Sequence, residues 1–178
     1  IDTGYSQCCH YDEKACGDAV AFKRIPAEER LLAVLADGLG HGLKANILAL
    51  MTTTMALRFS AEDREIVHSA EIIMDSLPVC RVRQISYATF TIVDTRLGGI
   101  TRVVEMGNPE FLLFRGGDEL PVKGDEFASP KYQDRTMTAY TFQAQPNDRV
   151  LFFSDGVTQA GLGSPRFPLG WRNSGVSD

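Results

Sequence analysis

The chain has 178 residues, of which 44% are hydrophobic, and it carries a formal net charge of -5 at pH 7. A chain of this length buries one substantial core, so we expect a single domain over residues 1–178. The acidic balance argues against nucleic acid or an anionic membrane as the main partner, because both bind a concentrated basic surface.

The first part of the chain predicts two strands followed by a helix. The runs AVAFKRI (19–25) and LLAVLA (31–36) are short and apolar or β-leaning, and PAEER between them is typical of an exposed connection. The segment 42–59 has apolar residues at helical spacing, which predicts a largely buried helix. Its predicted buried stripe consists of Leu43, Ile47, Leu50, Met51 and Thr54.

A second, amphipathic helix is predicted over residues 62–77. Ser60 is its candidate N-cap, with Asp63 three residues on, and Pro78 ends it. One face carries the apolar residues Ile66, Ala70, Ile73, Met74 and Leu77.

The pattern then changes to period two, which is typical of strands. Residues 85–123 contain alternating segments separated by Gly-Gly turns and are predicted to form an antiparallel meander, whereas 124–134 is predicted to be a loop. Two more strands are predicted in RTMTAYTFQ and DRVLFFSDG, and the tail reads as a loop or a severed element. The order favours an α+β layered domain. Because two helices cover only one face, we expect a further helical layer that this sequence does not contain.

The sequence carries no pattern that would direct the domain into or across a membrane. No stretch approaches 18 uninterrupted apolar residues and the start lacks a signal-peptide pattern, so we expect a cytoplasmic domain without membrane insertion. Because the chain begins with Ile1 rather than Met, we expect it to be excised from a longer protein, which leaves room for a regulatory domain outside it.

The four cysteines, Cys8, Cys9, Cys16 and Cys80, are expected to be reduced thiols. A zinc site made from Cys8, Cys9, His10 and Cys16, with or without His41, is disfavoured by its spacing.

Three aspartates lie at the ends of predicted strands. Asp18 begins one in CGDAVAF, Asp37 ends one in AVLADGLGHG, and Asp155 ends one in VLFFSDGV. Carboxylate, carbonyl and water oxygens are the ligands of Mg²⁺ and Mn²⁺, and a pair of such ions can activate a water as a nucleophile. An Asp-Gly pair after a strand is also an ordinary turn. The recurrence of the pattern favours the metal site.

Known short motifs do not account for these aspartates. Leu39 and His41 stand where an EF-hand starting at Asp37 would have oxygen ligands, and the chain has no Gly-Lys-Ser/Thr of a P-loop. The set CGD, ADGLGHGLKA, MGNPEFLLFRGG and FFSDGV, in this order, resembles the metal-dependent type 2C serine/threonine protein phosphatases. Within them it is most similar to the bacterial branch of the stage II sporulation protein E phosphatase domain. The resemblance covers nearly the whole chain.

The resemblance implies a four-layer αββα sandwich with two Mn²⁺ or Mg²⁺ ions at one end. It implies that Asp18 and Asp37 are ligands of the metals, that the Gly38 carbonyl is a further ligand, and that Asp155 binds one metal. A metal-activated water would hydrolyse phosphoserine or phosphothreonine without a phosphoenzyme, so Asp18, Asp37 and Asp155 are the implied catalytic residues. The implied substrate is a phosphorylated regulatory protein, such as an anti-anti-sigma or similar STAS-type domain.

The sequence departs from the family pattern in two places. The family's last aspartate has no counterpart after Asp155 except Asp178, which lies in a different kind of segment. We therefore expect the chain to be truncated, without the final helix and strand. Many eukaryotic members have His directly after the Asp-Gly pair, where this chain has Leu39. His41 is accordingly expected to cap or line the start of the helix rather than to act as a general acid.

Three further polar residues are candidate contacts for a substrate. Lys14 and Arg24 flank the first motif and could meet a phosphate, although solvated surface charge is the expected role of each. Asn108 is expected to be a turn residue, in a loop that could border the cleft. The two predicted helices directly follow the second motif and are a candidate switch for an outside domain. Two other functions stay open: a catalytically inactive binding or sensory module, and a thiol-based metal or redox sensor.

Overall fold

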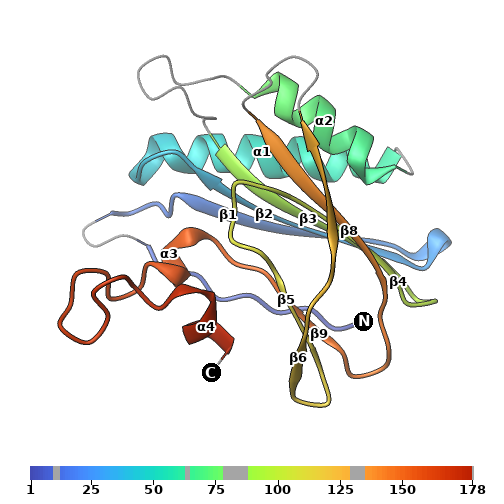
Figure 1. Cartoon of the computed structure of the whole chain (residues 1–178). Coiled ribbons are helices and arrows are strands. Elements are labelled where there is room, and N and C mark those ends of the chain that lie inside the picture. The colour runs from blue at the N-terminus through green and yellow to red at the C-terminus, as the bar shows by residue number, and fades with distance from the viewer. Residues whose placement is uncertain (10–12, 63–64, 78–87, 129–134, 178) are drawn as a thin grey trace.

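A computed structural model describes residues 1–9, 13–62, 65–77, 88–128 and 135–177 of the chain. The described residues form two antiparallel sheets, with two helices on the outer face of the larger sheet (Figure 1). This mixed α+β architecture with a sheet-on-sheet core confirms the predicted fold class. Predictions that concern His10, Asp63, residues 78–87 with Cys80, residues 129–134, and Asp178 lie outside the described residues.

The larger sheet has six strands, and every neighbouring pair is antiparallel. In spatial order its strands are β1 (Asp18–Ile25), β2 (Arg30–Gly38), β3 (Ala88–Arg96), β4 (Ile100–Met106), β8 (Thr136–Gln143) and β7 (Gly124–Ala128). A short 3-10 turn, Pro26–Glu28, joins β1 to β2 where the sequence predicted an exposed connection. The two first predicted strands are therefore confirmed as a hairpin.

The smaller sheet consists of β6 (Asp118–Leu120), β5 (Leu112–Arg115) and β9 (Arg149–Leu151). The predicted meander over 85–123 is thus wrong as one unit, since β3 and β4 belong to the larger sheet and β5 and β6 to the smaller one. The predicted loop at 124–134 is also wrong in its first half, which forms β7 and pairs with β8. Most side chains of β7 are exposed, so its sequence carries no apolar alternation that would indicate a strand.

The first helix, α1 (Gly42–Glu62), forms where it was predicted but buries the opposite face. Leu43 and Met51 are 66% and 56% exposed, and Ile47 and Leu50 are also exposed. The face against the sheet carries small or short residues: Gly42, Ala45, Ala49, Thr52, Thr53, Ala56 and Ser60. The predicted stripe of large residues is therefore wrong.

The reason lies in how closely α1 approaches β2. A Cβ atom placed on Gly38 would lie 2.0 Å from the Ala45 carbonyl oxygen, so the helix backbone rests almost directly on the end of the strand. Large side chains have no room in such a contact, because protein interiors are close-packed. Small residues on the inner face follow from that geometry.

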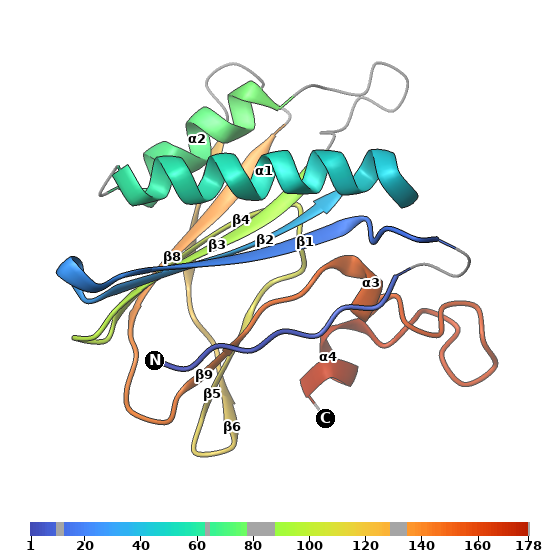
Figure 2. The same ribbon diagram turned by 180° about the vertical axis from the view of Figure 1, so that it is seen from behind.

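The second helix, α2 (Ile66–Ser76), buries the face that was predicted for it. Its start differs, because α1 continues through Ser60 to Glu62 and α2 begins only at Ile66. Ser60 is consequently a buried residue in the last turns of α1 and not a cap of α2. Both helices lie on the same face of the larger sheet in the two opposite views (Figures 1 and 2).

Two apolar cores result from this layering. The first lies between the helices and the larger sheet and includes Ile73 and Met74 from α2 with Phe90 and Ile92 from β3. The second lies between the two sheets and is centred on Val103, Phe111 and Tyr140. The period of two predicted within residues 85–123 is confirmed in β3, since Phe90 faces the first core and Val93 the second.

The side of the larger sheet opposite α1 and α2 holds the smaller sheet and two short helices, α3 (Asp155–Thr158) and α4 (Arg172–Ser177) (Figure 2). The predicted tail is therefore mainly turns, with one helical turn near its end. Among the described residues, no helix has the length and apolar character needed to cross a membrane.

Candidate metal centre

Asp18 and Asp37 lie side by side because of the β1–β2 register. Asp18 is the first residue of β1, Asp37 is the last but one of β2, and the antiparallel pairing places the two directly opposite each other. Directly opposed residues in such a pair have Cβ atoms about 5 Å apart. The first two predicted ligands are thus brought together at one end of the larger sheet.

Asp155 reaches the same end of the sandwich from the smaller sheet. The chain leaves β9 at Leu151, passes through Ser154, and begins α3 at Asp155. Ser154 is buried, and its Oγ donates a hydrogen bond of 2.7 Å to Asp18 Oδ2. Because Ser154 directly precedes Asp155, this bond joins the first and last motifs, which are 136 residues apart.

Sequence reasoning missed the part that Ser154 plays. It stands at the N-cap position of α3, where a serine is expected to bond the helix backbone, but its side chain makes no such bond. Its hydroxyl bonds Asp18 instead. A serine before a helix looks the same in sequence in both cases, so only the tertiary contact distinguishes them.

The electrostatics of Asp37 show that three carboxyl groups meet. Burial, together with the negative charges of Asp18 and Asp155, raises the pKa of Asp37 to about 7, and its carboxyl is within hydrogen-bonding reach of both. A carboxyl group next to two like charges strongly resists ionisation. A divalent cation at this point would remove that cost, because its charge reverses the local electrostatics.

The donor chemistry fits a hard cation. Asp18, Asp37 and Asp155 offer only carboxylate oxygens, which suit Mg²⁺ and Mn²⁺ better than soft metals. Among the described residues, however, no group of three or more His, Cys, Asp or Glu side chains is arranged so that it could hold a metal ion. The three carboxyls therefore fit a partial ligand set, of the kind that Mg²⁺ completes with carbonyl oxygens and water.

Gly38 connects this cluster to α1. Its backbone N–H donates to the Gly17 carbonyl at 3.2 Å, so the glycines of the first and second motifs are in direct contact. The close approach of the Ala45 carbonyl described above leaves no space for a side chain at position 38. The backbone around Gly38 is therefore held beside Asp18 by contacts on both sides.

A family model described as stage II sporulation protein E matches residues 27–169, which is most of the chain. The chain belongs to this family. The matched residues include β2 with Asp37, the helices α1 and α2, and the β9–α3 junction with Asp155. Asp18 lies just before the matched range.

Solved structures share the fold of this family member. RsbX in complex with magnesium is 22% identical, with a TM-score of 0.64 over 85% of this chain and 72% of that one. The type 2C phosphatase domain of SpoIIE from Bacillus subtilis, solved with a fragment of its regulatory domain, is 18% identical, with a TM-score of 0.67 over 82% of this chain and 43% of that one. The serine/threonine phosphatase of S. agalactiae is 16% identical, with a TM-score of 0.64 over 85% and 78%. No match was found among curated protein sequences.

Of the other candidate residues, His41, Lys14 and Arg24 lie on the surface of the domain. His41 is exposed just before α1, and its Nδ1 lies 2.6 Å from Glu13 Oε1. Lys14 is exposed. Arg24 is near the far end of β1 from Asp18 and donates to the carbonyl of Ile1 at 2.8 Å. The position of Arg24 thus agrees with a surface charge and not with a phosphate contact at Asp18, Asp37 and Asp155, which we call the acid cluster.

Asn108 binds two threonines of β3. Its amide oxygen accepts from Thr89 Oγ1, and its amide nitrogen donates to Thr91 Oγ1 at 3.0 Å. Thr89 is paired with Asp37 in the β2–β3 register. The loop after β4 is therefore fastened beside the acid cluster.

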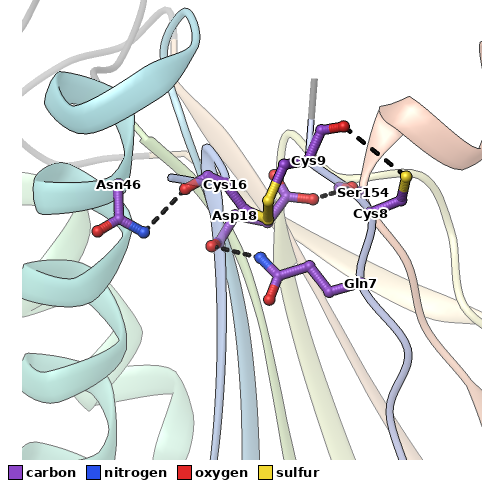
Figure 3. Close-up of a disulfide and its surroundings, with 7 residues drawn as sticks. All are labelled: Gln7, Cys8, Cys9, Cys16, Asp18, Asn46 and Ser154. Atoms are coloured by element: carbon purple, nitrogen blue, oxygen red, sulfur yellow. Dashed lines mark hydrogen bonds between the residues drawn. A yellow bond between two sulfur atoms is a disulfide. The ribbon is translucent and has the colours of Figure 1, made fainter. Parts of the chain in front are cut away.

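The prediction that all cysteines are reduced thiols is wrong for two of them. Cys9 and Cys16 form a disulfide, and Cys8 is an exposed free thiol (Figure 3). The two partners meet because the N-terminal segment runs back past the start of β1, where Gln7 Nε2 donates to the Asp18 carbonyl at 2.8 Å. A spacing of seven residues gave no sequence signal for this pairing.

A cavity of about 990 Å³ lies at the opposite end of the strands from the acid cluster. It opens between the N-terminal residues 1–4 and the loop 143–149, and its apolar wall includes Phe22, Val93 and Phe152. The cavity is therefore separate from the candidate metal centre, which lies at the other end of β2 and β3.

Proposed function

We propose that this domain hydrolyses phosphoserine or phosphothreonine on a phosphorylated regulatory protein, with two Mn²⁺ or Mg²⁺ ions as cofactors. One observation carries the proposal: Asp18, Asp37 and Asp155 come from separate motifs and meet closely enough to raise the pKa of Asp37. Membership in the stage II sporulation protein E family and the shared fold with type 2C phosphatases support it.

In the proposal, Asp18, Asp37 and Asp155 hold the cations, with the Gly38 carbonyl as a further ligand. The bound ions would lower the pKa of a water and offset the charge on the phosphoryl oxygens. Ser154 orients Asp18 through its hydrogen bond, and the packing of α1 on β2 keeps the Gly38 backbone in place. The substrate that this family membership favours is a STAS-type, anti-anti-sigma-like protein.

A second candidate function is a catalytically inactive module that binds a partner. The observation that favours it is that, among the described residues, no group of three or more His, Cys, Asp or Glu side chains is arranged so that it could hold a metal ion. This candidate predicts a folded protein that binds its partner without metal-dependent turnover.

The deciding experiment compares the wild-type chain with Asp37→Asn. Hydrolysis of p-nitrophenyl phosphate and of a phosphorylated STAS-type protein is measured with Mn²⁺ and with a chelator, and Mn²⁺ binding is measured by calorimetry. The matched control is Asp125→Asn, because Asp125 is an exposed aspartate on β7. We expect Mn²⁺-dependent activity in the wild type and the control, and loss of on the order of a hundredfold or more in Asp37→Asn.

The two candidate functions give different results in this experiment. If all three folded proteins are equally inactive and none binds Mn²⁺, the phosphatase proposal fails and the binding module takes its place. Activity that persists in chelator would also contradict the proposal.

A further inference from the structure

The disulfide Cys9–Cys16 lies directly beside the acid cluster. Cys16 is two residues before Asp18, and Figure 3 shows the two sulfur atoms next to Asp18, between the N-terminal segment and α1. The segment 16–18 is thus joined covalently to the N-terminal segment 1–9. We call the disulfide, Gln7 and the segment 16–18 the clasp.

Every residue of the segment 16–18 has an anchor in a different part of the fold. The Cys16 carbonyl accepts from Asn46 Nδ2 of α1 at 2.8 Å, and the Gly17 carbonyl accepts from the Gly38 N–H of β2. Asp18 is paired with Asp37 in the β1–β2 ladder, and two further bonds hold it: its carbonyl accepts from Gln7, and its carboxylate accepts from Ser154. The bonds from Asn46, Gly38 and Ser154 come from α1, β2 and the β9–α3 junction, whose positions do not depend on the disulfide.

The Gln7 anchor is different because it depends on the N-terminal segment. Residues 1–9 are all exposed, and their described contacts with the rest of the fold include the bond from Arg24 to the Ile1 carbonyl and the ring contact of Tyr5 with Phe22. Without the disulfide, Gln7 would belong to a free chain end that pays the full conformational entropy of being ordered.

The two cysteines of the disulfide also differ in exposure. Cys9 is exposed whereas Cys16 is partly buried, so a reductant reaches the Cys9 side of the bond more easily. Thiol–disulfide exchange proceeds by attack of a thiolate on one sulfur, and access to that sulfur is one of the factors that set its rate.

We infer that Cys9–Cys16 is a reversible thiol–disulfide site for a dithiol reductant, and that its reduction loosens Asp18 and weakens divalent-cation binding at the acid cluster. The cation-binding half of this inference rests on the proposed function. The thiol–disulfide half rests on the clasp alone.

The chemistry balances with one dithiol per disulfide. A thiolate of the dithiol attacks Cys9 Sγ, the Cys9–Cys16 bond breaks, and the Cys16 sulfur leaves as a thiolate and takes up a proton. The second thiol of the reductant loses its proton and attacks the mixed disulfide, which releases Cys9 as a thiol and closes the reductant into a disulfide. Two electrons pass from the dithiol to the clasp, and both cysteines end as thiols.

The size of the effect follows from loop closure. A disulfide that closes a loop as short as 9–16 lowers the conformational entropy of the open segment. It therefore shifts the equilibrium between the ordered and the open segment by one to two orders of magnitude at most. Only part of that restriction acts on Asp18, because its other anchors persist. We therefore expect reduction to raise the Mn²⁺ dissociation constant on the order of tenfold.

The test compares the oxidised chain, the chain reduced with dithiothreitol and then freed of it under nitrogen, and the double variant Cys9→Ser/Cys16→Ser. Peptide mapping without reduction first verifies the Cys9–Cys16 link. Hydrogen exchange of peptides that contain residues 13–18 reports the clasp, and calorimetry reports Mn²⁺ binding. Cys8→Ser is the matched control, because Cys8 is the neighbouring thiol outside the disulfide.

We expect faster exchange at 13–18 and weaker Mn²⁺ binding in the reduced chain, the same values in the double variant whatever the redox state, and wild-type behaviour in Cys8→Ser. Absence of the link in the peptide map, or equal exchange in the oxidised and reduced chains, would overturn the inference. Faster exchange with unchanged Mn²⁺ affinity would overturn its cation-binding half. Faster exchange with no Mn²⁺ binding in any form would keep the thiol–disulfide site and count against the proposed function instead.

Discussion

The buried carboxyl of Glu105 makes the stability of the fold depend on pH in an unusual direction. Glu105 is on β4, 5% exposed, and faces the core between the sheets, as does Val103 two residues before it. The Phe111 N–H donates to its Oε1 at 3.0 Å. Burial raises the pKa of Glu105 from 4.5 to about 8, and the nearby charge of Glu110 adds to the rise.

The sign of the effect follows from proton linkage. Between the unfolded and folded pKa values the folded chain keeps a proton that the unfolded chain releases, so stability falls as the pH rises. The contribution is fully present below pH 4.5 and is lost as the pH passes through about 8. From about pH 5.5 to pH 7.5 this one group removes roughly 2.5 kcal/mol of unfolding free energy.

Replacement by Gln removes the titration and keeps the shape. In Glu105→Gln the amide oxygen still accepts from the Phe111 N–H, and the amide group donates as the protonated carboxyl does. We expect the stability of the variant relative to the wild type to rise by roughly 2.5 kcal/mol between pH 5.5 and pH 7.5. Asp37 also has a raised pKa, but it is present in both proteins, so its contribution cancels.

Urea unfolding followed by circular dichroism, in chelator and at several pH values, measures this difference. The control is Glu126→Gln, an exposed position on β7, which should follow the wild-type curve. Parallel curves for the wild type and Glu105→Gln would refute the reasoning, because they would mean that Glu105 ionises alike in the folded and unfolded chains.

Three further predictions use the same unfolding assay. Gly38→Ala should cost about 3 kcal/mol or more, because the new methyl group would meet the α1 backbone at 2.0 Å, whereas Gly98→Ala, with open space around it, should be nearly neutral; equal effects would contradict the contact. Arg30→Met should cost about 3 to 5 kcal/mol of unfolding free energy, because it leaves the buried Asp94 carboxylate without its bidentate partner, which donates to it at 2.7 and 3.0 Å. Adding Asp94→Leu should restore most of that stability. Leu50→Gln should change stability by less than about 0.5 kcal/mol, and a large loss would mean that this face of α1 is buried after all.

The sequence predicted the features that rest on local patterns. The β1–β2 hairpin, α2 with its apolar face, and the alternation in β3 each have a period that one element imposes on its own residues. The three aspartates could also be found, since each follows or begins an apolar run at a glycine. Their meeting at one metal site was inferred from their recurrence at the ends of predicted strands and from the family resemblance, and the register of Asp18 with Asp37 gives it a physical basis.

The features that failed depend on partners distant in the sequence. No local pattern tells that β5 leaves the larger sheet while β4 stays in it, or that exposed residues 124–128 pair with β8. The disulfide and the bond from Ser154 to Asp18 are likewise contacts between segments, and each involves residue types that occur widely elsewhere.

The reversed face of α1 shows how fold and site constrain each other. Apolar periodicity indicates which large residues share a face, but it cannot tell whether that face or the one with small residues meets the sheet. Here the site decides, because Gly38 bonds Gly17 beside Asp18 and α1 starts four residues later. A helix that begins so close to the strand end has to lie against the backbone of β2, and only residues such as Ala45 and Ala49 permit that approach. The same short connection that holds Gly38 beside the carboxylates therefore turns the large side chains of α1 outward.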